Sequence, residues 1–159
     1  MHFAVLTISD RCSRGEAIDT AGPAVAKMLH AAWPDGQIAT ALLPDDEDRI
    51  AAKLIEWSGQ GINLILTAGG TGLGPRDCTP EATRRVIDRE APGIAELMRL
   101  KGSEKHAFSW LSRAVVGMRG RTLIVNLPGS LRGATESLEA ILPLVHHAVD
   151  VAAGGQRHP

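Results

Sequence analysis

Short apolar runs alternate with amphipathic segments along most of the 159-residue chain. Runs of a few aliphatic or β-branched residues predict five strands, at 3–8, 38–43, 62–66, 114–118 and 122–125. The first run is almost continuously apolar, which is typical of a parallel strand covered on both faces. The last two are separated by Arg119-Gly120-Arg121, a spacing that favours a hairpin.

Between these runs, apolar residues recur at the spacing of one helix face. This period predicts helices at 23–33, 48–57, 80–89 and 94–100, and a long closing helix at 131–151. We expect Thr79 to cap the third helix, with Pro80 in its first position, and Ser130 to cap the last. Pro143 lies inside the closing segment and is expected to kink or split it.

The alternation of strands and helices predicts an α/β fold. Short connections favour a three-layer α/β/α sandwich around a mainly parallel sheet. The length suits a single domain, which we place at 1–151, followed by a polar tail at 152–159.

Polar residues follow four of the predicted strands. They are Ser9-Asp10, Asp45, the loop that starts at Gly69, and the stretch 126–130. The carboxyl ends of parallel strands lie on one edge of a sheet, so these residues can converge there. Ser9 and Asp10 could equally be ordinary cap and turn residues, and that alternative stays open.

The segment 67–80 is the most distinctive of these loops. Four glycines lie within six residues, at 69, 70, 72 and 74, between a strand and a helix. Glycines there allow positive φ angles and let backbone N–H groups approach an anion, while Thr71, Arg76 and Asp77 add polar groups. The segment fits neither a P-loop, because Pro75-Arg76 stands where Lys-Ser or Lys-Thr belongs, nor a dinucleotide fingerprint. On the glycines alone, a plain tight turn is as good an explanation as a phosphate site; Arg76 and Asp77 favour the phosphate site.

Composition argues against several classes of protein. The net charge of -1 and the aromatic content of 3% argue against a nucleic-acid-binding protein. No apolar run approaches the ~20 residues of a membrane span, and the first residues do not resemble a signal peptide. Cys12 and Cys78 form no CxxC pair, so we expect free thiols and a cytoplasmic protein.

The runs 67–72 and 75–83 together resemble the signature of the MogA/MoaB family of molybdopterin-binding proteins, which includes the G domains of gephyrin and of plant molybdenum-cofactor proteins. Four further stretches match the family in order: Ser9-Asp10, Pro44-Asp45, Leu111-Ser112-Arg113 and 126–129. Two positions depart from the pattern. Cys78 replaces the usual valine, and Leu131-Arg132 stands where the family often has Pro-Lys.

The resemblance implies molybdenum cofactor biosynthesis by transfer of an adenylyl group from ATP to molybdopterin, with Mg²⁺ and release of pyrophosphate. It assigns a role to each of these residues: catalysis and metal to Asp45 and Asp77; nucleotide phosphates to Ser9, Asp10, Gly69, Gly70, Thr71 and Gly72; molybdopterin to Ser112, Arg113, Pro128, Gly129, Ser130 and Arg132. It also implies a homotrimer and a downstream molybdate-inserting enzyme as a partner. A non-catalytic, MoaB-like molybdopterin carrier or regulator remains the alternative.

Overall fold

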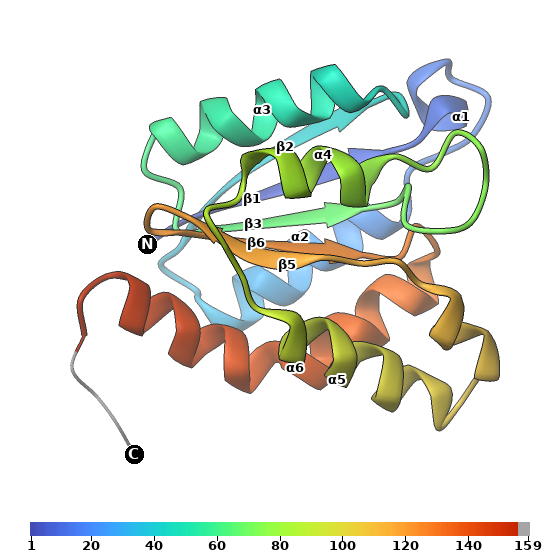
Figure 1. Ribbon diagram of the computed structural model, residues 1–159. Helices are drawn as coiled ribbons and strands as arrows, with labels where there is room; N and C mark the ends of the chain where they lie inside the picture. The colour runs from blue at the N-terminus through green and yellow to red at the C-terminus, as the bar shows by residue number, and fades with distance from the viewer. Residues whose placement is uncertain (156–159) are drawn as a thin grey trace.

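A six-stranded sheet runs through the centre of the protein (Figure 1), whose computed structural model describes residues 1–155. Its strands are β1 (His2–Ile8), β2 (Gln37–Leu43), β3 (Leu64–Ala68), β4 (Arg89–Glu90), β5 (Val116–Arg119) and β6 (Thr122–Leu127), in the spatial order β2-β1-β3-β6-β5-β4. Strands β2, β1, β3 and β6 are parallel, and β5 pairs antiparallel with both of its neighbours. The predicted hairpin is therefore confirmed.

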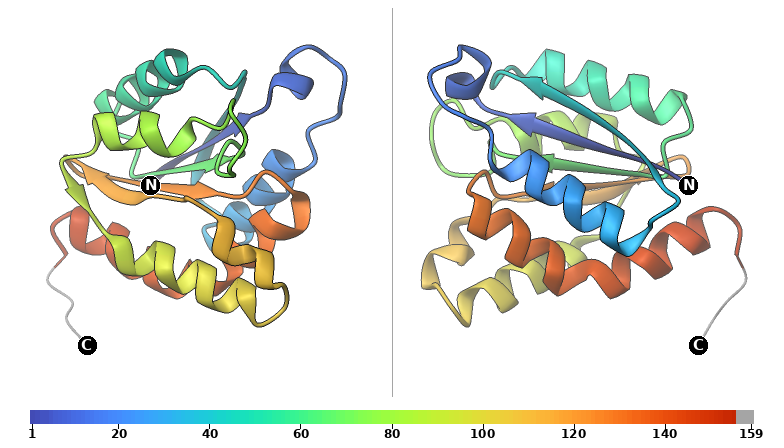
Figure 2. Two further views of the ribbon diagram at one scale, coloured as in Figure 1. Left: turned by 45° about the vertical axis from the view of Figure 1, so that its right-hand side comes forward. Right: turned by 180° about the vertical axis from the view of Figure 1, so that it is seen from behind.

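Helices cover both faces of the sheet, as Figures 1 and 2 show. Helices α3 (Glu47–Gly59) and α4 (Thr79–Val86) lie on one face; α2 (Ala21–Ala32), α5 (Pro92–Ser103) and α6 (Leu131–Ala152) lie on the other. Two short elements, α1 (Asp10–Ser13) and the 3-10 helix η1 (Ala107–Leu111), lie in loops between the main elements. The predicted three-layer α/β/α sandwich is confirmed.

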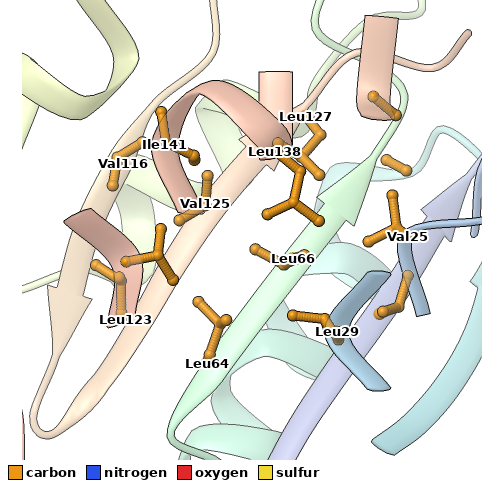
Figure 3. Close-up of a cluster of buried hydrophobic side chains, with 14 of the residues drawn as sticks. Val25, Leu29, Leu64, Leu66, Val116, Leu123, Val125, Leu127, Leu138 and Ile141 are labelled. Atoms are coloured by element: carbon orange, nitrogen blue, oxygen red, sulfur yellow. The ribbon is translucent and has the colours of Figure 1, made fainter. Parts of the chain in front are cut away.

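The pleat of each strand divides the core into two parts. In β1, Phe3 and Val5 face α2, α5 and α6, whereas Ala4, Leu6 and Ile8 face α3 and α4. Figure 3 shows the first part, where side chains of β3 and β6 meet those of α2 and α6. Because apolar side chains are buried on both faces, β1, β3 and β6 are anchored along their whole length, and their ends present loops from a rigid support.

The region after the glycine loop departs from the sequence prediction in two ways. Helix α4 ends at Val86 rather than 89, because Arg89 and Glu90 pair with β5 as an edge strand. Thr79 is not the helix cap: the cap position is Cys78, which makes no side-chain capping bond, and Thr79 is the first helical residue.

Helix α6 follows its prediction more closely. The Ser130 Oγ accepts a hydrogen bond from the Gly133 N–H at 3.1 Å, so Ser130 is the predicted cap. The helix runs unbroken through Pro143, and the right-hand view of Figure 2 shows it bending instead of splitting. It ends at Ala152, and residues 156–159 of the predicted tail lie outside the described part of the chain. None of the described helices is both long and apolar enough to cross a membrane.

Candidate functional site at the carboxyl edge of the sheet

The four predicted polar loops do meet at one edge of the sheet. They follow β1, β2, β3 and β6, the four parallel strands. Strand β2 lies on one side of β1 and β3 on the other, so the strand order changes direction between β1 and β3. Open α/β sheets bind their ligands at such a point, because the loops on its two sides diverge and leave a crevice.

Asp10 and Asp45 link the loops that follow β1 and β2. The Asp10 N–H donates to Asp45 Oδ2 at 2.9 Å, and the Asp45 N–H donates to Asp10 Oδ1 at 3.0 Å. Arg76 extends from the glycine loop to the same pair and donates to the Asp45 carbonyl at 2.8 Å. Ser9 caps the short α1, where its Oγ accepts from the Cys12 N–H.

The two carboxylates differ in their acidity. The hydrogen bond from Arg76 holds the pKa of Asp10 below its usual value, whereas burial raises the pKa of Asp45. Asp45 is thus the carboxylate whose charge has the less favourable surroundings in this structure. A bound cation would relieve that cost.

Positive φ angles at Gly69 (118°) and Gly70 (64°) turn the chain sharply at the end of β3. A Cβ at Gly69 would lie 2.1 Å from the Ile8 carbonyl oxygen, and one at Gly70 would lie 2.3 Å from Thr79 Oγ1. Only glycine fits at either position, so the loop packs closely on the end of β1 and the start of α4.

Gly72 and Gly74 have a different role. The Asp77 carboxylate lies against both of them, since a Cβ at either glycine would be within 3 Å of Asp77 Oδ2. That oxygen accepts a hydrogen bond from the Gly74 N–H at 2.8 Å. The loop therefore folds around Asp77 and fixes one of its carboxylate oxygens.

Arg113 holds the outer part of this loop. Its Nε donates to the Gly72 carbonyl at 2.7 Å, its Nη2 to the Asp77 carbonyl at 2.8 Å, and its Nη1 to Glu81. Its backbone N–H donates to the Thr71 carbonyl at 2.9 Å. All three guanidinium nitrogens have protein partners here, so direct contact between Arg113 and molybdopterin stays a prediction.

A pocket of about 540 Å³ opens beside the glycine loop. Nine of the predicted residues line it: Gly70, Thr71, Gly72, Asp77, Ser112, Pro128, Gly129, Ser130 and Arg132. The remaining five predicted residues, Ser9, Asp10, Asp45, Gly69 and Arg113, are not part of its lining. Gly70 connects the two groups, because a Cβ on it would lie 3.0 Å from Asp45 Oδ1.

Sequence reasoning missed six lining residues: His106, Phe108, Ser109, Leu111, Gly133 and Glu136. Four of them come from the region of η1, where no helix or strand period is visible. Glu136 could have been predicted as a lining residue, because it lies one helical turn after the predicted Arg132. Arg132 donates to Glu136 at 3.0 Å and Lys105 lies 3.3 Å from it, and the Arg132 bond lowers the pKa of Glu136. Arg132 and Lys105 therefore compensate the negative charge of Glu136 on this side of the pocket.

The donor set fits a magnesium ion better than a transition metal. No group of three or more His, Cys, Asp or Glu side chains in residues 1–155 could hold a metal ion, but Asp45 and Asp77 are two carboxylates at one edge. Magnesium takes one or two carboxylates and completes its shell with water and substrate phosphates. Cys78 is an unsuitable ligand or nucleophile, because burial raises the pKa of its thiol to about 11.

Comparisons with known proteins agree with this geometry. Residues 4–147 match the family described as "Probable molybdopterin binding domain". The chain is 36% identical over 156 residues to a molybdopterin adenylyltransferase of Helicobacter pylori strain J99, covering 97% of this chain and 89% of that protein. It is 38% identical over 148 residues to the molybdenum cofactor synthesis protein cinnamon of Drosophila melanogaster, of which it covers 25% and which in turn covers 92% of this chain.

Among solved structures, the molybdopterin biosynthesis enzyme MoaB of Thermus thermophilus has the same fold. The two superpose with a TM-score of 0.89 at 51% sequence identity, over 96% of each chain.

Proposed function

The chain belongs to the molybdopterin-binding domain family, and from that premise we propose that it transfers the adenylyl group of ATP to molybdopterin in molybdenum cofactor biosynthesis. The observation that carries this proposal is the contact of the glycine loop with both the carboxylates and the pocket. A Cβ on Gly70 would lie 3.0 Å from Asp45 Oδ1, and Gly70 also lines the 540 Å³ pocket. A nucleotide phosphate on this loop would lie next to a molybdopterin in the pocket.

In the proposed reaction, a terminal phosphate oxygen of molybdopterin attacks the α-phosphorus of ATP. A new oxygen–phosphorus bond forms, the bond from the α-phosphorus to the bridging oxygen of the β-phosphate breaks, and pyrophosphate leaves with that electron pair. Such transfers depend on positioning and on neutralising charge rather than on a covalent nucleophile.

The residues of this chain divide that work. Backbone N–H groups of the glycine loop and the Thr71 hydroxyl hold nucleotide phosphates, together with Ser9 and Asp10 at the end of β1. Ser112, Arg132 and the stretch 128–130 orient molybdopterin in the pocket. Asp45 and Asp77 hold Mg²⁺, which when bound neutralises phosphate charge.

A pyrophosphate-release assay tests the proposal. Purified protein with ATP, Mg²⁺ and molybdopterin should release pyrophosphate and form adenylylated molybdopterin, and omission of molybdopterin should stop the release. Binding of molybdopterin with no pyrophosphate released under any of these conditions would contradict the enzyme and favour the non-catalytic carrier.

We also propose a cytoplasmic homotrimer that passes its product to a molybdate-inserting enzyme. The apolar stripe of α6 gives the trimer no support, because Val145 and Val149 are buried within the single chain. The edge strand β2 offers some: Leu42 on it is 40% exposed, and one edge of the strand has no neighbour in the described chain. Sedimentation at micromolar concentration tests the trimer, and an active monomer would contradict it.

A further inference from the structure

Thr79 is a buried residue whose hydroxyl has no hydrogen-bond partner in the described part of the chain. The residue is 0% exposed, and its backbone N–H donates to the Gly70 carbonyl at 3.1 Å. Its Oγ1, however, makes no hydrogen bond. Leaving a buried hydroxyl without a partner is unfavourable, and folded proteins rarely do so without a reason.

Other buried threonines nearby show the usual arrangement. Thr83 lies one turn further along α4, is equally buried, and its Oγ1 accepts from Asn126 Nδ2 at 2.9 Å. Within residues 1–155, the only other buried side-chain oxygen without a partner is Oε2 of Glu81, whose second oxygen is bound by Arg113. Thr79 is therefore an exception that calls for a ligand.

The position of the Thr79 hydroxyl indicates where such a ligand would lie. A Cβ built on Gly70 would lie 2.3 Å from Thr79 Oγ1 and 3.0 Å from Asp45 Oδ1. Both oxygens therefore lie beside the Cα of Gly70, close enough to exclude a side chain there. Asp45 Oδ1 is itself without a hydrogen bond among the described residues, since the Asp10 N–H binds Oδ2.

A hydroxyl oxygen and a carboxylate oxygen beside the same glycine are both groups that can contact a hydrated cation. The hydroxyl can accept from or donate to a water molecule, and the carboxylate binds the ion or another of its waters. Magnesium in particular keeps several of its waters when it binds a protein.

We propose that Thr79 is a positioning residue of the metal–nucleotide site: its hydroxyl binds a water molecule of the hydrated Mg²⁺ that Asp45 holds beside Gly70. The inference rests on the proposed function, because it needs Mg·ATP to bind at this edge. It assigns to Thr79 a role toward the metal rather than toward helix α4.

Three variants test it: Thr79→Val, which replaces the hydroxyl with a methyl group; Thr79→Ser, which keeps the hydroxyl; and Thr83→Val as the control. Without ligands, Thr79→Val should melt at or above the temperature of the parent protein, because it loses no hydrogen bond. Thr83→Val should melt at a lower temperature, because it strands the Asn126 amide. A drop for Thr79→Val as large as that for Thr83→Val would overturn the inference, since it would reveal a structural partner.

The metal is tested by ATP binding in calorimetry, once with excess Mg²⁺ and once with EDTA. Thr79→Val should bind ATP 10- to 100-fold more weakly than the parent with Mg²⁺ and equally well in EDTA, and Thr79→Ser should restore most of the loss. If Thr79→Val binds ATP as tightly as the parent in both buffers, or more weakly by the same factor in both, the role proposed for Thr79 is overturned. The proposed function stays intact in either case. A parent protein that binds no ATP with Mg²⁺ would overturn both.

Discussion

Arg76 donates two hydrogen bonds to the carboxylate of Asp10, a residue 66 positions earlier in the sequence, at 3.0 and 3.2 Å. The pair joins the glycine loop to the end of β1, across the point where the strand order changes direction. The Arg76 side chain is 67% exposed, so salt should weaken this link. The link can thus yield when a nucleotide enters.

The Asp10 pKa gives a direct measure of this link. Because Arg76 lowers that pKa in the folded protein, the pair stabilises the fold above the unfolded-state pKa, and the contribution is lost as pH falls through the lower, folded-state value. In Arg76→Gln, the Asp10 pKa measured by carboxyl NMR should move up. An unchanged value would show that the bond is absent in solution.

Asp45→Asn should separate stability from activity. Burial raises the pKa of Asp45, so its charge costs the folded state free energy at neutral pH and that cost disappears as the carboxyl is protonated in acid. The variant should melt no lower than the parent at neutral pH, and any gain should vanish at acid pH. Pyrophosphate release should fall 100-fold or more, on the scale of one lost electrostatic contact. A variant with normal turnover would exclude Asp45 from the metal site.

Asp77→Asn should also abolish adenylyl transfer while the protein stays folded. The amide oxygen of asparagine can still accept the Gly74 N–H, so the loop keeps its bond while the charge is lost. We expect a loss of roughly 100- to 1,000-fold in kcat with a parent-like melting temperature. Asp77→Ala is the companion variant: it should lower both activity and stability, because it removes the bond as well.

Gly70→Ala should block the site, with Gly120→Ala as its matched control. Both glycines have positive φ angles, 64° and 55°, so both substitutions impose backbone strain of about 1 kcal/mol or more. A Cβ at Gly120 meets nothing within 4 Å, whereas a Cβ at Gly70 meets Thr79 and Asp45. Calorimetric titration should therefore show ATP binding lost in Gly70→Ala alone. Equal affinity in the two variants would mean that this part of the loop is only a turn.

Arg113→Lys should loosen the glycine loop, although it keeps the charge. A lysine ammonium cannot reach the Gly72 and Asp77 carbonyls and Glu81 together in the geometry of the guanidinium fork. We expect a loss of about 2 kcal/mol in stability and faster amide hydrogen exchange at Asp77. If Arg113 instead binds only molybdopterin, the variant should exchange and melt like the parent and lose affinity for molybdopterin alone.

The sequence was most informative where one local signal sufficed. Apolar runs located β1, β2, β3 and both strands of the hairpin, and Ser130 could be identified as a cap from its place before an apolar stripe. Strand β4 was missed because it has only two residues, Arg89 and Glu90, both exposed, so no apolar pattern marks it. The partners of the Arg113 side chain lie 32 to 41 positions away, and no local pattern predicts contacts of that kind.

Thr79 is a position where a local sequence signal led to a wrong prediction. Its place before a proline is typical of a helix cap, and local reasoning assigned it that role. The structure instead makes Thr79 the first helical residue, because the Cys78 carbonyl accepts the first intrahelical hydrogen bond, from the Ala82 N–H at 3.0 Å. The Thr79 N–H is then free to donate to the Gly70 carbonyl of the glycine loop.

Asn126 has a consequence for how the protein opens. Its side chain is fully buried, donates to Thr67 and Thr83, and accepts from the Val115 N–H. These partners belong to the strand before the glycine loop, the helix after it and the segment that carries Arg113. To release any one of them would strand buried polar groups on the others, so the three segments should open as one foldon. Amides on either side of the glycine loop should then exchange only through a shared, large-scale opening, while the loop between them exchanges locally.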